Sequence, residues 1–79
     1  MRGDRMKHNN EIYNFCRNVL YLRKKHGLTQ VQMAKIMDVG VGTVRLLERG
    51  VMPPRLSADV LWRLHDYFHL SVSQLFNDL

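Results

Sequence analysis

The stretch GLTQVQMAKIMDVGVGTVRLLERG, residues 27–50, decides the fold. It contains two short amphipathic segments that are separated by a turn. Thr29 predicts the N-cap of a helix, and Gln32 three residues later completes a capping box. Leu28 and Met33 have the spacing of a hydrophobic staple across the first turn of the same helix. These signals agree on one helix that begins directly after Thr29.

The second half of this stretch predicts a turn and another helix. Asp38 and Gly40 bracket a short turn, so the first helix ends near Met37. The next helix covers about residues 41–49, and Gly50 ends it. Two short helices that are joined by a turn of about three or four residues form a helix-turn-helix arrangement.

Upstream, the sequence predicts one longer helix over about residues 10–26. Apolar residues recur there at steps of three and four, which is the spacing of one helix face. Gly27 can adopt the left-handed conformation that ends such a helix. Residues 1–9 are charged and lack this periodicity, so we expect a flexible N-terminal arm. A single domain should follow over residues 10–79.

Downstream, two further helices are predicted. The consecutive prolines of VMPPR, residues 51–55, stop helix propagation and favour an extended connection. Ser57 is the expected cap of the fourth helix, while Ser71 with Gln74 repeats the capping box for a fifth. The expected fold is therefore all-α and compact, with five helices and no strand. The predicted core consists of Ile12, Val19, Leu22, Met33, Ala34, Met37, Val44, Leu47, Leu61, Leu64, Phe68 and Leu75.

Length and charge restrict the function. The chain has 79 residues, enough for one small core. Twelve Lys and Arg residues against seven Asp and Glu give a net charge of +5, which favours a polyanionic partner. There is no apolar run long enough to cross a bilayer and no secretory h-region, so we expect a cytoplasmic protein without a membrane partner. Cys16 is the single cysteine and is interpreted as a core residue.

The sequence gives little support for catalysis. No Ser, His and acid grouping and no pair of carboxylates has a recognisable spacing, and so short a helical chain has little room for a pocket. We therefore expect a protein that is not an enzyme and uses no cofactor. His65 and His69 are four residues apart and could share one helix face, which leaves a metal site as an alternative. No third ligand is evident, so no metal is expected.

Residues 27–50, together with SADVLWRLHDYFHLSVSQLF at 57–76, resemble the lambda-repressor-like, Cro-type (XRE) family of helix-turn-helix regulators. The resemblance covers about residues 10–77. Its most specific parts are Leu28 to Gln30, Ala34, Glu48 to Gly50 and Ser71 to Phe76. It implies a lambda-repressor-like DNA-binding domain and a sequence-specific transcriptional regulator. Helix 41–49 would enter the major groove, and helix 30–37 would fix the phosphate backbone.

The resemblance also implies the residues that would face the bases. These are Val41, Gly42, Thr43, Arg45 and Leu46. Only Thr43 and Arg45 can hydrogen-bond a base edge, while Val41 and Leu46 could pack on thymine methyl groups. Gly42 would allow the backbone to approach the DNA closely.

Other residues are expected to contact phosphates or to hold the scaffold. The N-terminus of helix 30–37 is a suitable phosphate anchor because its amide groups are exposed there. The expected phosphate contacts are Thr29, Gln30, Lys35, Arg49 and Arg55. Arg23 and Glu48 match positions that form a salt bridge in the family, although both could instead be solvated charges.

Two features leave alternatives open. Val31 and Ile36 are apolar where the family usually has polar residues, and Val41 and Leu46 are apolar too. A protein-interaction module, either antitoxin-like or a regulator's inhibitor, is therefore the alternative function, with a protein as partner. A homodimer through the C-terminal helices is expected from an excess of apolar residues. These are Trp62, Tyr67, Leu70, Val72, Phe76 and Leu79. Alternatively, Trp62 and Tyr67 could pack over Tyr13 and Leu20.

Overall fold

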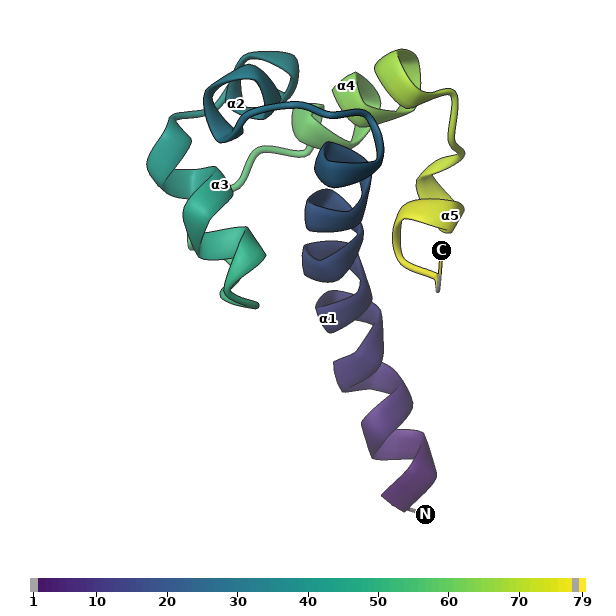
Figure 1. The fold of residues 1–79 in the computed structure, drawn as a ribbon. Helices are drawn as coiled ribbons and strands as arrows, with labels where there is room; N and C mark the ends of the chain where they lie inside the picture. The colour runs from purple at the N-terminus through teal and green to yellow at the C-terminus, as the bar shows by residue number, and fades with distance from the viewer. Residues whose placement is uncertain (1, 78) are drawn as a thin grey trace.

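A computed structural model describes residues 2–77 and 79, with side chains from residue 11 onward. Its described residues form helices and connecting segments, with no strand (Figure 1). The elements are α1 (Arg2–Lys25), α2 (Gln30–Met37), α3 (Val41–Glu48), α4 (Asp59–Phe68) and α5 (Val72–Leu75). The predicted all-α, five-helix fold is confirmed.

The first helix is longer than the sequence pattern predicted. It begins at Arg2, not near residue 10, and its N-terminal turns extend away from the other helices (Figure 1). Apolar periodicity reports packing against a core, so it is absent where a helix projects beyond the fold. No proline interrupts this segment, and the helix continues through it. The predicted start was therefore wrong. Met1 of the expected arm lies outside the described residues.

Local capping signals explain the start of two helices. Thr29 Oγ1 accepts a hydrogen bond from the Gln32 backbone N–H at 3.0 Å, and Gln32 Oε1 accepts one from the Thr29 N–H at 2.8 Å. Ser71 and Gln74 form the same reciprocal pair before α5, with distances of 3.1 and 2.8 Å. Both predicted capping boxes are confirmed. They satisfy N–H groups that the first turn of a helix leaves unpaired.

The start of α4 differs from the prediction. Its N-cap is Ala58, which makes no side-chain cap, and not Ser57. Ser57 Oγ instead accepts a hydrogen bond from the Asp59 N–H at 3.2 Å, and the Ser57 carbonyl accepts one from Val60 N–H at 3.1 Å. Ser57 thus forms a turn one residue before the helix.

One core joins the five helices. Its buried apolar residues are Phe15, Cys16, Val19, Leu22, Met33, Ala34, Met37, Val44, Leu47, Val60, Leu64 and Leu75. Leu61 and Phe68 pack against it while remaining partly exposed. Ile12 was wrongly placed in the core: it is 50% exposed, because α1 has already left the fold at this turn. Burial raises the pKa of the Cys16 thiol, so this residue is a core side chain with a suppressed reactivity.

Asn18 is a buried polar residue that the sequence did not reveal. Its Nδ2 donates to the carbonyl oxygens of Leu75 and Asn77, at 2.8 and 2.6 Å. These carbonyls lie at the end of α5, where a helix leaves acceptors without an internal partner. Asn18 therefore attaches the C-terminal helix to α1.

The α2 and α3 helices lie at the edge of the fold. In Figure 1, α3 and α5 lie on opposite sides of α1, and α2 connects to α3 at the edge of the fold. The α2 and α3 helices pack on each other, α3 packs on α1, and α2 packs on α4. The outer surface of α3 is consequently not covered by another helix.

Candidate functional site

The turn between α2 and α3 fixes the relative orientation of these helices. Asp38 has φ +57° and ends α2 in the left-handed conformation, which Asp tolerates better than most residues. Its N–H donates to the Lys35 carbonyl at 3.2 Å, and the Val39 N–H donates to Ala34 at 3.0 Å. Gly40 precedes α3 in an extended conformation and provides no side-chain cap. The turn is therefore short and closed by backbone hydrogen bonds.

The α3 helix has an inner and an outer side. Val44 and Leu47 are fully buried, as predicted. Of the residues expected to face bases, Gly42 and Arg45 are exposed, and Val41, Thr43 and Leu46 are partly exposed. Val41 also packs against the core, which reduces the apolar surface that the helix offers to a partner.

The proline segment brings a further cation beside α3. Thr43 and Leu46 line a hollow of about 300 Å³ together with Arg55. Val39, Pro53, Pro54 and Leu56 complete its wall. Arg55 is an expected phosphate contact, so the fold brings it next to two of the expected base-facing residues.

An ion pair attaches the end of α3 to α1. Arg23 Nε donates to Glu48 Oε2 at 2.5 Å, and Arg23 Nη2 donates to Oε1 at 3.1 Å. A third bond, from Nη1 to the Leu28 carbonyl at 3.0 Å, orients the guanidinium. The expected ion pair is thus present. Burial opposes ionisation of Glu48, but the hydrogen bonds from Arg23 and Gln30 and the charges of Arg23 and Lys24 outweigh it and lower its pKa.

Gln30 extends this pair into a polar chain. Its Nε2 donates to Glu48 Oε1 at 3.0 Å, and its Oε1 accepts from Arg45 Nε at 3.3 Å. An expected phosphate contact and an expected base contact are therefore bonded to each other. Sequence reasoning missed this connection because the two residues are far apart in the chain and only the fold brings them together. The chain Arg23, Glu48, Gln30 and Arg45 links α1, α2 and α3.

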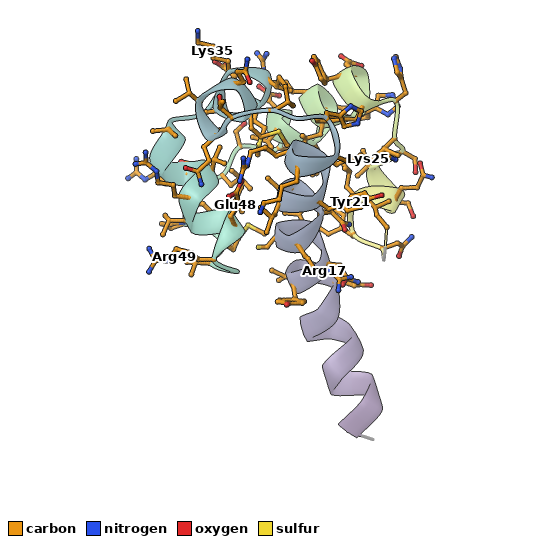
Figure 2. The ribbon with its side chains drawn as sticks, viewed as in Figure 1. Arg17, Tyr21, Lys25, Lys35, Glu48 and Arg49 are labelled. Atoms are coloured by element: carbon orange, nitrogen blue, oxygen red, sulfur yellow. The ribbon has the colours of Figure 1, made fainter. Side chains whose placement is uncertain are left out.

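Three expected phosphate contacts are exposed cations: Lys35, Arg49 and Arg55. Within the described part of the chain, none of their side chains has a hydrogen bond or an ion pair. Figure 2 shows Lys35 beyond α2 and Arg49 at the end of α3, well apart from each other. The fold therefore distributes these charges around the two helices and does not gather them at one point.

The sequence matches the Helix-turn-helix family over residues 19–75. This region starts within α1 and includes all of the other helices. The chain belongs to the helix-turn-helix family, of the Cro/C1 (XRE) type. Members of this family are DNA-binding transcription regulators, and this function applies to the chain in general terms. Searches of curated proteins and of solved structures found no significant match.

In this helix-turn-helix chain, His65 and His69 each have a structural role at the end of α4. His65 Nδ1 lies 2.6 Å from the Leu70 carbonyl, and His69 ends α4 with φ +58°. Among the side chains that the structure describes, those of residues 11–77 and 79, no three His, Cys, Asp or Glu are grouped to hold a metal ion. None of the helices in the described residues is long and apolar enough to cross a membrane.

Proposed function

We propose that this chain is a sequence-specific regulator that binds double-stranded DNA with α3 in the major groove. The observation that carries this proposal is the uncovered outer side of α3, whose inner side is fixed by buried Val44 and Leu47. The bond between Arg23 and Glu48 holds the last turn of the same helix against α1. A helix that is attached on its inner side and uncovered on its outer side is what entry into the groove requires.

The proposed base-facing residues are Val41, Gly42, Thr43, Arg45 and Leu46. Arg45 is the strongest candidate for reading a base, because an arginine can donate two hydrogen bonds to guanine O6 and N7. Its Nε is bonded to Gln30, while its two terminal nitrogens have no partner among the described residues. Gln30 would therefore hold the guanidinium while these nitrogens contact the base.

The proposed phosphate contacts are Thr29, Gln30, Lys35, Arg49 and Arg55. The exposed Arg49 and Arg55 support this role best, since both lie next to α3 and neither is neutralised by a described acid. Such contacts supply affinity for any DNA sequence and weaken as salt increases. Lys35 lies at the opposite end of α2 from Thr29 and has the weakest support.

DNA titrations with two variants test the proposal. Arg45→Ala should lower the preference for a selected site over random DNA, because it removes base contacts. Arg49→Ala should weaken binding to both DNAs by a similar factor and reduce the salt dependence. Equal losses on both DNAs for both variants would contradict the division of roles.

A protein-interaction module remains the second candidate. It is favoured by Val31, which is 53% exposed on α2. The partly buried Val41 and Leu46 speak against it, because they leave less apolar surface than their sequence positions suggested. If the purified chain fails to retain any sequence from a random DNA library at low salt, the protein-interaction function replaces the DNA-binding one.

A homodimer is also part of the proposal. Helix-turn-helix dimers bind two half-sites about one helical turn, about 34 Å, apart. Of the apolar residues expected at the interface, Trp62, Tyr67 and Leu79 are exposed, whereas Leu70 and Phe76 pack against the core. Trp62 and Tyr67 are 59% and 52% exposed. This exposure speaks against the alternative in which the two side chains are buried against Tyr13 and Leu20. This exposure supports an interface centred on α4.

A further inference from the structure

The outer face of α4 combines two large aromatic side chains with two opposite charges. Trp62, Arg63, Asp66 and Tyr67 are all exposed. The Trp62 ring packs edge-on against His65 at a centroid distance of 5.9 Å, and Tyr67 packs edge-on against Phe68 at 4.8 Å. Each aromatic residue therefore contacts one neighbouring ring, while more than half of its surface is exposed to solvent.

Arg63 and Asp66 make few interactions within one copy of the chain. Arg63 lies 3.4 Å from Asp38 in an ion pair between two largely exposed side chains, which contributes little to stability. The Asp66 side chain has no hydrogen bond or ion pair with any other described residue. A hollow of about 300 Å³ lies beside these charges and is lined by Ile36, Arg63, Asp66 and Tyr67. The face is therefore open, partly apolar and able to form further ion pairs.

We propose that α4 pairs in an antiparallel orientation with α4 of a second copy of this chain. The two-fold axis would pass between Leu64 and His65. Residues equally far from this axis on its two sides then lie level with each other. Arg63 is level with Asp66 of the second copy, and the symmetry repeats this pair of opposite charges. Trp62 is level with Tyr67 of the second copy in the same way.

The order of residues along α4 is therefore self-complementary only when the helices run in opposite directions. A parallel pair in register would place Arg63 beside Arg63 and Asp66 beside Asp66, which is repulsive. Charge complementarity thus favours both a second copy as the partner and one orientation. This inference specifies the surface of the proposed homodimer, and its test requires no DNA.

The size of the surface sets the expected strength. Ten helical residues are only about 15 Å long, so one helix face covers less than the roughly 800 Å² per partner of a standard interface. We expect a weak dimer that is populated at high protein concentration. None of the α4 residues is a proposed DNA contact, so the proposed pairing and the proposed DNA contacts use different residues.

Charge exchange tests the pairing. Sedimentation equilibrium of the full chain should show a monomer–dimer equilibrium, and R63D and D66R should each raise the dissociation constant by about tenfold or more. The double variant R63D/D66R restores opposite charges across the axis and should bring the constant back near its original value. Emission from Trp62, the single tryptophan, should shift to shorter wavelength as dimers form.

Three controls separate this surface from other effects. Asp38→Asn removes the ion pair with Arg63 inside one copy and should leave dimerisation unchanged. Tyr21→Ser removes an exposed aromatic residue of α1 and should also have no effect, whereas Trp62→Ser should weaken the dimer. Circular dichroism checks that each variant is folded. A chain that stays monomeric up to millimolar concentration would overturn the proposal. The proposal would also be overturned if the loss of dimer affinity in R63D/D66R were the sum of the losses in R63D and D66R.

Discussion

Arg23 and Glu48 are joined by two side-chain hydrogen bonds, although the two residues are 25 positions apart in the chain. The pair connects the C-terminal part of α1 to the last residue of α3. Both side chains are mostly buried, with exposed fractions of 16% and 8%. A buried ion pair of this kind adds little to the free energy of unfolding when it is compared with a pair of apolar residues. The loss of one partner is costly, however, because it leaves a buried charge without a counter-charge.

Replacement of Glu48 by Ala should therefore be strongly destabilising. The change leaves Arg23 without its carboxylate and Gln30 without an acceptor, and we expect a loss of about 3 kcal/mol in the free energy of unfolding. Glu48→Gln keeps the shape and part of the hydrogen bonding, so its loss should be smaller. Urea unfolding monitored by circular dichroism measures both values. Equal losses for the two variants would show that the charge of Glu48 has no part in the effect.

The ion pair also predicts a dependence on pH. The pKa of Glu48 is lower in the folded chain than its ordinary value of 4.5, so ionised Glu48 stabilises the fold above that pH. This contribution decreases as pH falls below 4.5 toward the lowered pKa. The difference in unfolding free energy between the native chain and Glu48→Gln should decrease correspondingly on acidification. A difference that is the same at about pH 6 and about pH 3 would contradict this expectation.

Leu47 tests the packing of α3. It is fully buried, and its truncation to Ala should cost about 2–5 kcal/mol through lost burial and a residual cavity. The total stability of so small a domain is about 4–12 kcal/mol, so thermal unfolding should occur at a much lower temperature. Val31→Ala is the matched control, because Val31 is an exposed residue of α2, and the free energy of unfolding should change by no more than about 0.5 kcal/mol. An unchanged melting temperature for Leu47→Ala would contradict the assignment of the inner side.

Local signals explain why much of this fold could be predicted from the sequence. Thr29 and Ser71 each lie three residues before a glutamine, and the capping box depends on nothing beyond this spacing. The left-handed conformation of Asp38 is equally local, because few residues tolerate it. Signals of this kind fix where helices begin and end, and the repeat of apolar residues then indicates which side faces inward.

Features that depend on distant parts of the chain could not be predicted in the same way. The repeat that placed Ile12 in the core is a property of α1 alone, whereas its exposure depends on where the other helices stop covering α1. The buried Asn18 has carbonyl partners near the C-terminus, which no spacing indicates. At the candidate site, the positions of α3 were predictable, but the bond between Gln30 and Arg45 was not.

That bond leads to a prediction for Gln30. Gln30→Ala removes a proposed phosphate contact and also the acceptor that holds Arg45 Nε. We therefore expect weaker binding to all DNA, together with a fall of up to about tenfold in the preference for the selected site over random DNA. Arg49→Ala is the control, since it should weaken both without changing their ratio. Competition binding assays measure the ratio, and an unchanged ratio in Gln30→Ala would show that Gln30 does not position Arg45.

Gly42 offers a test in which stability and DNA binding should change in opposite directions. It lies in the first turn of α3, and a Cβ added there would meet no atom within 4 Å. Ala is a better helix former than Gly, so Gly42→Ala should raise the free energy of unfolding by about 0.5–1 kcal/mol. If the backbone of α3 approaches the DNA closely at this point, the added methyl group must displace it, and affinity should decrease by about tenfold.

Gly40→Ser is the matched control for Gly42→Ala. Gly40 is the N-cap of α3, has space around it and is not a proposed DNA contact. Serine can accept a hydrogen bond from the first turn, so this variant should gain a few tenths of a kcal/mol and retain its DNA affinity. A Gly42→Ala chain that is more stable and binds DNA as tightly as the native chain would exclude close backbone approach at α3. Loss of affinity in Gly42→Ala but not in Gly40→Ser would instead assign the effect to the face of the helix, because both variants stabilise the same element.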